Sequence, residues 1–273
     1  GLTDGEGINP DYSFLQHGPQ LYNNGYGMWW LDEVAMWADK LNGLSYALSS
    51  QAIANLRNLI LEGNQWMIRR SFWDPLGGGR LIGIKDVPNV HKKSDFVARR
   101  DLLSSLEYMK RADPDYSGRY QSFIDHIKGK NDGNLIGNKH FWRGDYHAHR
   151  RSNYSFHIRM CSERTFVSER GNGMNVANQY LSQGATMIMV DGNEYERIFP
   201  CWEWSNIPGV TAPYKGHKSP VPQTSKTWGV RGTCSFVGGV SNGKYGIAVK
   251  DLDWDGVTGK KSWFCFDDDI VCL

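Results

Sequence analysis

The hydrophobic pattern of this chain changes from a helical to a strand-like period near residue 129, and this change most constrains the fold. Before it, apolar residues recur at three- and four-residue intervals over long stretches. After it, short stretches alternate in polarity or are continuously apolar, as strands are. Residues 129–137 are rich in Gly, Asn and Asp, which is typical of a linker. Helices followed by strands predict an α+β fold.

The first half of the chain predicts several helices. Residues 28–42 have an apolar stripe with most charged residues outside it. The stripe consists of Trp30, Val34, Trp37, Ala38 and Leu41. Residues 45–70 predict a longer helix, with Ser45 as a possible N-cap and Gly63 as a weak point. The Gly-rich run at 74–80 ends it.

Two further helices are expected before the linker. Ser94 is a candidate N-cap for the third, which ends at Asp113-Pro114 because proline cannot continue a helix. Its expected inward residues are Phe96, Leu103, Leu106 and Met109. The fourth helix covers about 116–127.

The second half predicts antiparallel strands. The expected strands are residues 154–160, 185–190, 245–249 and 262–266. The pair Gly238-Gly239 and the run 241–243 are interpreted as turns.

The loop at residues 11–27 carries the strongest candidate chemistry. Its apolar residues follow neither the helical nor the strand period. It presents His17 and Tyr26, nine residues apart, on an irregular backbone. A His and a Tyr can act together as general base and general acid near neutral pH. The alternative from the residues alone is a turn with a packed tyrosine and a hydrogen-bonded histidine.

Three ordered blocks resemble polysaccharide lyase family 8, which includes chondroitin AC, hyaluronan and xanthan lyases. The first is YSFLQHGPQLYNNGYG at 12–27. The second begins with NYSF at 153–156 and continues through RM, SERT and SE to GN at 171–172. The third runs from DGNEY at 191–195 through FPCWEW to IPGVT at 207–211. The likeness covers nearly the whole chain and is nearest to the chondroitin AC type.

The resemblance also implies a domain organisation. It predicts the C-terminal part of an α/α toroid of helical hairpins over residues 1–130. It predicts the N-terminal part of an antiparallel β-sandwich domain over residues 131–273. The chain is therefore expected to be a piece of a longer protein, with more chain upstream and downstream.

The family reaction implied by the resemblance is β-elimination, which cuts a glycosidic bond next to a uronic acid and leaves an unsaturated uronate. His17 and Tyr26 match the family's catalytic His and Tyr, with the same spacing. Tyr26 is implied as the base and then the acid. His17 is implied as the group that holds the uronate, or as the base for substrates of opposite C5 stereochemistry. Arg80 matches the first family arginine, and Glu169 the glutamate that orients Arg and Tyr.

Weaker substrate-binding candidates follow from the same comparison. Asn172 matches a polar residue near the family site. The second family arginine falls at Ile84, and Lys85 next to it can supply a point charge but not a bidentate fork. The family's carboxylate-neutralising Asn lies upstream of Gly1. Without the family, Arg80 is interpreted as a surface arginine and Glu169 as a charge at a strand edge.

No cofactor is expected, although the chondroitin AC type implies calcium. Glu203 and Tyr214 of that calcium segment remain, but Ser205 replaces an Asp and another Asp is missing. Calcium takes six to eight oxygen ligands, so the set is incomplete. His147, His149 and His157 have no completing ligand by spacing, and we interpret them as satisfied or surface histidines.

Composition bounds the partners. The net charge of +2, from 31 basic and 29 acidic residues, does not suggest a nucleic-acid partner. No apolar run is long enough to span a bilayer. Five Cys argue against a full disulfide framework, because the number is odd. The expected partner is an anionic polysaccharide, and the resemblance implies a secreted or periplasmic protein.

Three functions are compatible with the sequence. The first is a lyase that acts on chondroitin or hyaluronan. The second is a lyase of the same mechanism on another uronate polymer such as xanthan, which the loss of the second arginine at Ile84 favours somewhat. The third is a non-catalytic, carbohydrate-binding fragment. The first two require Glu169 to approach Arg80 or Tyr26, and His17, Tyr26 and Arg80 to converge on one open groove.

Overall fold

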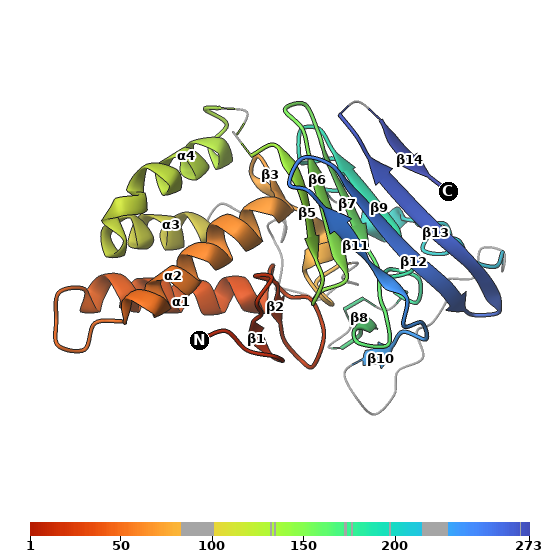
Figure 1. The fold of residues 1–273 in the computed structure, drawn as a ribbon, viewed down its shortest axis with the longest axis horizontal. Helices are drawn as coiled ribbons and strands as arrows, with labels where there is room; N and C mark the ends of the chain where they lie inside the picture. The colour runs from red at the N-terminus through yellow and green to blue at the C-terminus, as the bar shows by residue number, and fades with distance from the viewer. Residues whose placement is uncertain are drawn as a thin grey trace.

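The computed structural model describes residues 1–82, 101–131, 133, 135–171, 174, 175, 177–196, 198–214, 229–267 and 269–273. Figure 1 shows helices gathered at one end of the molecule and antiparallel sheets at the other, which confirms the α+β class. Within this part of the chain, no helix combines the length and the apolar character that crossing a bilayer requires. The five cysteines are free thiols.

The α-helices precede the two large sheets along the chain, as expected, but four two-residue strands also lie in the helical half. The described α-helices are α1 (Tyr26–Leu41), α2 (Ser50–Asn58), α3 (Asp101–Ala112) and α4 (Ser117–Ile127). The described strands are β1 (Gly7–Ile8), β2 (Phe14–Leu15), β3 (Ile68–Arg69), β4 (Phe72–Trp73), β5 (Gly137–Phe141), β6 (Tyr146–Arg150), β7 (Ser155–Arg159), β8 (Phe166–Glu169), β9 (Ala185–Met189), β10 (Gly229–Arg231), β11 (Val237–Ser241), β12 (Gly246–Trp254), β13 (Val257–Cys265) and β14 (Ile270–Cys272).

Two four-stranded antiparallel sheets form the strand half. The inner sheet has the order β5-β6-β7-β9, and the outer sheet has the order β11-β12-β13-β14. A separate short pair, β8 with β10, lies below them in Figure 1. Because β8 ends at Glu169, this pair carries a candidate site residue.

The two central strands of the inner sheet, β6 and β7, are buried on both faces. Its residues Tyr146 and Ala148 share one hydrophobic core with Leu31 of α1. On the opposite face, Phe156 packs in a second core with Trp263 of the outer sheet. The inner sheet is therefore a middle layer between the helices and the outer sheet. All five residues of both β6 and β7 are buried.

Helix α1 forms where it was expected, but its buried face differs from the predicted stripe. The buried residues are Gly27, Met28, Leu31, Ala35 and Ala38. Trp30 is 40% exposed and Trp37 is 53% exposed, so two of the five predicted stripe residues point away from this core. Helix α1 packs against α3, and Asp32 and Asp39 of α1 accept hydrogen bonds from Ser105 and Arg111 of α3.

The predicted helix at 45–70 is shorter and interrupted. It begins after Ser49, whose side chain accepts a 3.2 Å bond from the Ala52 amide, and not after Ser45. At Leu59–Gly63 it widens into a π-helical turn, and a 3₁₀ turn follows at Asn64–Met67. A Cβ at Gly63 would lie 2.5 Å from the Tyr12 carbonyl oxygen, so the N-terminal loop packs directly against this break.

The other secondary-structure predictions are mostly confirmed. Leu106 and Met109 of α3 are fully buried, whereas Ser94 and Phe96 lie outside the described residues. The four expected strands correspond to β7, β9, β12 and β13. The Gly238-Gly239 turn is wrong, because both residues lie inside β11. The His140 ring occupies the space where a side chain at Gly239 would be, with its Nδ1 2.9 Å from a Cβ built there.

Buried histidines join the two sheets. Asn138 Nδ2 donates to His147 Nε2 at 2.8 Å and lies 3.2 Å from His149 Nδ1. His149 Nε2 then donates to the Phe266 carbonyl oxygen at 2.7 Å, and His147 Nδ1 lies 3.4 Å from His140 Nδ1. His147 and His149 are fully buried, so they are satisfied histidines and not surface ones. Burial lowers the pKa of His149 to about 4 and holds the pKa of His147 well below its usual range.

Acid is expected to destabilise the protein through these histidines. They are neutral when folded, whereas an unfolded histidine has a pKa of about 6.5, so the unfolded state binds more protons below that pH. The free energy of unfolding therefore falls as the pH drops from about 6.5 toward about 4, by about 2 kcal/mol for His149 at about pH 5. Urea denaturation at a series of pH values measures this slope.

The variant His149→Gln removes one of the titrating groups and keeps a side chain that can donate to Phe266. Its stability should depend less steeply on pH than that of the wild type over the same range. An unchanged slope would contradict the assignment of His149 as a neutral buried group.

Candidate active site

His17 sits on a strained turn after β2. Its backbone φ is 58°, a left-handed conformation that is uncommon for residues other than glycine. The turn is fixed by Glu6, whose Oε1 accepts a 2.5 Å bond from the Gly18 amide. Strain of this kind persists only where surrounding contacts impose it, and it is frequent at functional sites. The turn brings the His17 ring to 4.8 Å from the Tyr26 ring, edge to face.

Tyr26 is the first residue of α1. The preceding Gly25 has a φ of 84°, and a Cβ there would lie 2.4 Å from Leu81 Cδ1. A side chain at position 25 is therefore excluded both by backbone conformation and by space. The chain can enter the helix sharply at this point, which aims the Tyr26 phenol back toward the His17 turn.

Arg80 follows the Gly-rich turn and reaches across to the tyrosine. Asp74 opens this turn, and its Oδ1 accepts a 3.1 Å bond from the Leu76 amide. Its Oδ2 accepts from the Tyr146 hydroxyl at 2.5 Å and lies 3.3 Å from His157 Nδ1, which ties the turn to the inner sheet. The Arg80 guanidinium donates from Nη2 to the Tyr26 oxygen at 2.7 Å.

Both carboxylate oxygens of Glu169 contact the side chains of this site. It is fully buried at the end of β8 and forms an ion pair with Arg80 through Oε1. His17 Nδ1 lies 2.9 Å from the same oxygen, and the Tyr22 hydroxyl donates to Oε2. His17 Nδ1 also lies 3.2 Å from Arg80 Nη1. His17 and Arg80, which lie 152 and 89 positions before Glu169 in the sequence, thus meet at its carboxylate.

The backbone of Glu169 is held by two buried asparagines. Asn175 and Asn178 each donate from Nδ2 to the Glu169 carbonyl oxygen at 2.8 Å. Both residues are fully buried. They fix the end of β8 where it turns toward the helical half.

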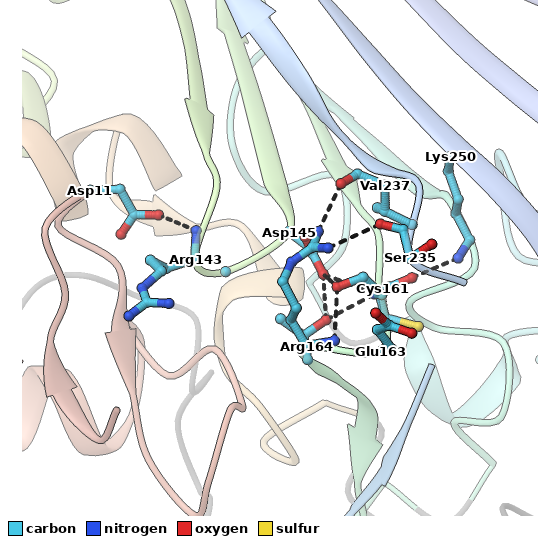
Figure 2. A network of polar contacts seen from close by, with 12 residues as sticks. Asp11, Arg143, Asp145, Cys161, Glu163, Arg164, Ser235, Val237 and Lys250 are labelled. Carbon is cyan, nitrogen blue, oxygen red and sulfur yellow. Dashed lines mark hydrogen bonds and ion pairs between the residues drawn. The ribbon is translucent and has the colours of Figure 1, made fainter. Parts of the chain in front are cut away.

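The start of β8 is anchored by the network around Asp145 that Figure 2 shows. Asp145 Oδ2 accepts from the Ser162 amide at 2.8 Å and from the Thr165 hydroxyl at 2.5 Å. Arg164 donates to the Val237 carbonyl oxygen at 2.8 Å, which links this loop to the outer sheet. Because Thr165 directly precedes β8, the network sets the position from which the strand runs to Glu169.

Arg80 and Glu169 are more deeply buried than the two groups that can transfer protons. Arg80 is 5% exposed and Glu169 is 0% exposed, whereas His17 and Tyr26 are half-buried. A buried cation next to the phenol oxygen stabilises negative charge there more strongly than it would in water. The arrangement can therefore support proton transfer at Tyr26, with His17 beside it. The open groove around these residues stays a prediction.

The structure brings together four of the six predicted site residues: His17, Tyr26, Arg80 and Glu169. Arg80 and Glu169 are buried, so the surface interpretations of both are wrong. Asn172, Lys85 and Ile84 lie outside the described residues. Sequence reasoning missed Tyr22, although it lies inside the quoted 12–27 block, four residues before Tyr26.

The implied calcium segment contains Glu203, Ser205 and Tyr214. The Glu203 carboxylate accepts a hydrogen bond from the Ser205 hydroxyl, so the replacing serine occupies one of its oxygens. Tyr214 is 78% exposed. Across the described ranges, no three His, Cys, Asp or Glu side chains cluster as metal ligands would.

Comparison with known families matches both halves. Residues 2–126 match the model described as the polysaccharide lyase family 8 N-terminal alpha-helical domain, and residues 136–273 match the super-sandwich domain of the same family. The chain belongs to polysaccharide lyase family 8. The resemblance inferred from the three blocks is confirmed.

Individual relatives agree with the family. The chain is 39% identical to the chondroitinase-AC of Pedobacter heparinus over 98% of its length and 37% of that protein. It is 25% identical to the hyaluronate lyase of Thermasporomyces composti, covering 38% of that protein. A solved chondroitinase AC lyase, studied with oligosaccharides, superposes with a TM-score of 0.86 at 35% identity over 97% of this chain and 38% of that one. The chain thus spans about two fifths of these relatives' lengths.

Proposed function

We propose that the protein containing this chain is a lyase that cleaves chondroitin or hyaluronan by β-elimination and leaves an unsaturated uronate. The observation that carries the proposal is the Arg80 guanidinium, which joins the Tyr26 phenol at 2.7 Å to the buried Glu169 carboxylate. Family membership and the 39% identity to a chondroitinase-AC support it.

Tyr26 is assigned both proton transfers. It takes the proton from C5 of the uronate and returns it to the leaving glycosidic oxygen as the C4–O bond breaks. A phenol is a weak base at neutral pH, so the reaction needs a cation that stabilises the phenolate. Arg80 supplies it and also lies where it can donate to the leaving oxygen. Positioned acid–base groups contribute about 10²–10⁴-fold to a rate.

His17 is assigned to holding the uronate. Its Nδ1 contacts Glu169 Oε1 and Arg80 Nη1, so Nε2 is the nitrogen offered to a substrate, including one of opposite C5 stereochemistry. Glu169 is assigned a positioning role, since it is fully buried and contacts Arg80, His17 and Tyr22. Asn172 and Lys85 remain proposed substrate contacts.

A lyase of the same mechanism on another uronate polymer is the second candidate. The observation in its favour is Ile84, which stands where the family has its second arginine. An isoleucine cannot donate to a sulfate or a carboxylate.

We further propose a secreted or periplasmic protein with an anionic polysaccharide as its partner, and a domain boundary at 130/131.

Ultraviolet absorbance of the unsaturated uronate tests the proposal. The intact protein is mixed separately with chondroitin sulfate, hyaluronan and xanthan, and initial rates are compared. Absorbance that rises with the first two polymers supports the leading function, and a rise with xanthan alone supports the second. Binding without any rise on all three would assign the protein to carbohydrate binding and overturn both lyase proposals.

Gly79→Ala is expected to reduce turnover by about 10²-fold, because small misplacements of a catalytic group cost that much. Gly79 has a φ of 56°, and a Cβ there would lie 2.1 Å from the Tyr22 ring. The turn must shift to relieve the clash, and Arg80 shifts with it. The absorbance assay measures the effect. Gly118→Ala is the control, since Gly118 lies in α4 with open space around it, and its turnover should match the wild type.

A further inference from the structure

Tyr22 lies at the junction of the segments that build the site. It is fully buried, and its hydroxyl donates to Glu169 Oε2 at the end of β8. The same oxygen lies 3.1 Å from the Arg80 amide and 3.5 Å from Arg80 Nη1. Its ring packs edge to face on Tyr26, with centroids 5.0 Å apart. One phenol thus contacts Glu169, both ends of Arg80 and the Tyr26 ring.

Hydrogen-bond directions give Tyr22 and Tyr26 different capacities. The Arg80 groups are donors, so the Tyr22 oxygen accepts from them and its own proton goes to Glu169. Burial, and then the charge of Glu169, hold the pKa of Tyr22 far above its usual range. Tyr22 therefore keeps its proton at all working pH values. Tyr26 is half-buried and accepts from Arg80 Nη2, so it is the phenol that can exchange a proton with a substrate.

We infer that Tyr22 is a positioning residue for the lyase reaction: its hydroxyl neutralises part of the charge on Glu169 and so leaves more of the Arg80 charge for Tyr26. This inference rests on the proposed function and assigns a role that no family motif pointed out in the sequence. Glu169 Oε1 is shared by Arg80 and His17, while Oε2 receives the Tyr22 proton. Without that donor, a fully buried carboxylate must draw more strongly on Arg80.

Tyr22→Phe removes one oxygen and keeps the ring that packs on Gly79 and Tyr26. The kcat should fall on the order of 10- to 100-fold, because the arginine is drawn away from the phenol. The KM should stay within a few-fold of wild type, since Tyr22 is fully buried and does not face a substrate. The acidic limb of the kcat profile, which reports loss of the proton from the general base, should move to higher pH.

The helical half offers a matched control. Tyr120 is fully buried and donates to Asp113 Oδ2 at 2.8 Å. Arg57 pairs with the same carboxylate through two bonds of 2.7 and 3.0 Å. Tyr120→Phe therefore removes the same type of hydroxyl from the same type of Tyr–carboxylate–Arg group outside the site. Its kcat and its pH profile should equal those of the wild type, even if it loses similar stability.

A double-mutant cycle tests whether Tyr22 acts through the carboxylate. The kcat and pH profile are measured for the wild-type intact protein, Tyr22→Phe, Glu169→Gln and the double variant. If Tyr22 acts through Glu169, adding Tyr22→Phe to Glu169→Gln should change kcat by less than about twofold.

Additive effects, an unmoved acidic limb, or a Tyr22→Phe protein that fails to fold while Tyr120→Phe folds would each overturn the inference. If the wild-type protein forms the unsaturated product, each of these results leaves the proposed function intact. A wild type that forms no unsaturated product on any of the three polymers would overturn both.

Discussion

Tyr26→Phe is expected to lower turnover by about 10²–10⁴-fold, the range for a lost general acid–base group. The substitution removes one oxygen and keeps the ring, so its contacts with Trp29 and His17 remain. Arg80 Nη2 loses its acceptor on Tyr26, but the ion pair between Arg80 Nη1 and Glu169 remains. Substrate affinity should stay near wild type, because the groups assigned to hold the uronate are unchanged. Initial rates of unsaturated-product formation measure the effect.

Two companion variants make this result specific. Tyr12→Phe is the control, because Tyr12 is also half-buried in the N-terminal segment and its hydroxyl accepts a 3.0 Å bond from Asn58. Its turnover should be unchanged. His17→Ala should weaken both affinity and turnover, since His17 is assigned to hold the uronate. If Tyr26→Phe kept turnover within a few-fold of wild type while His17→Ala abolished it, His17 would be the base and Tyr26 a wall of the site.

Arg80→Ala is expected to lower the free energy of unfolding by about 3–5 kcal/mol, because it leaves a buried carboxylate without its cation. Glu169 is 0% exposed and Arg80 only 5% exposed, so water does not replace the lost partner. Urea denaturation at neutral pH measures the loss. This prediction depends on packing and charge alone, so it holds whichever polymer is the substrate.

The control is Arg111→Ala. Arg111 forms an ion pair with Asp39 through two bonds of 2.9 and 2.7 Å, but its side chain is 55% exposed. An exposed pair contributes at most about 1 kcal/mol, so this variant should be nearly as stable as the wild type. Equal losses in the two variants would show that Glu169 is not held in a dry environment.

The order of elements could be predicted from hydrophobic period, but the orientation of α1 could not. Trp30 and Trp37 score as apolar and suggest a buried stripe, yet the core receives Ala35 and Ala38. The helical period predicts the spacing of the buried residues, whereas the elements that pack on the helix decide which face is buried.

Breaks within elements required tertiary information. The helix that was expected to run to residue 70 changes at Gly63, where the Tyr12 carbonyl approaches the backbone. The Gly238-Gly239 pair resembles a turn in sequence, but the glycine at 239 serves to admit the His140 ring under β11. In both cases the cause is a contact from a segment about fifty or more residues away in sequence.

The site was predicted unevenly for a related reason. His17 and Tyr26 lie in one loop with unusual composition, so their pairing was visible locally. Arg80 and Glu169 became candidates only through the family resemblance, because each alone resembles a surface charge. Tyr22 lies inside the same loop and was missed, since Arg80 and Glu169, which contact its hydroxyl, are distant in sequence.

The route of bond cleavage is tested most directly by digesting chondroitin sulfate and hyaluronan in heavy-oxygen water and weighing the products by mass spectrometry. Elimination adds no water, so we expect fragments whose masses sum to that of the substrate, with no heavy oxygen at the cut. Each cut should also create one unsaturated uronate. Fragments that gain one water per cut, labelled with heavy oxygen, would show hydrolysis and contradict the account.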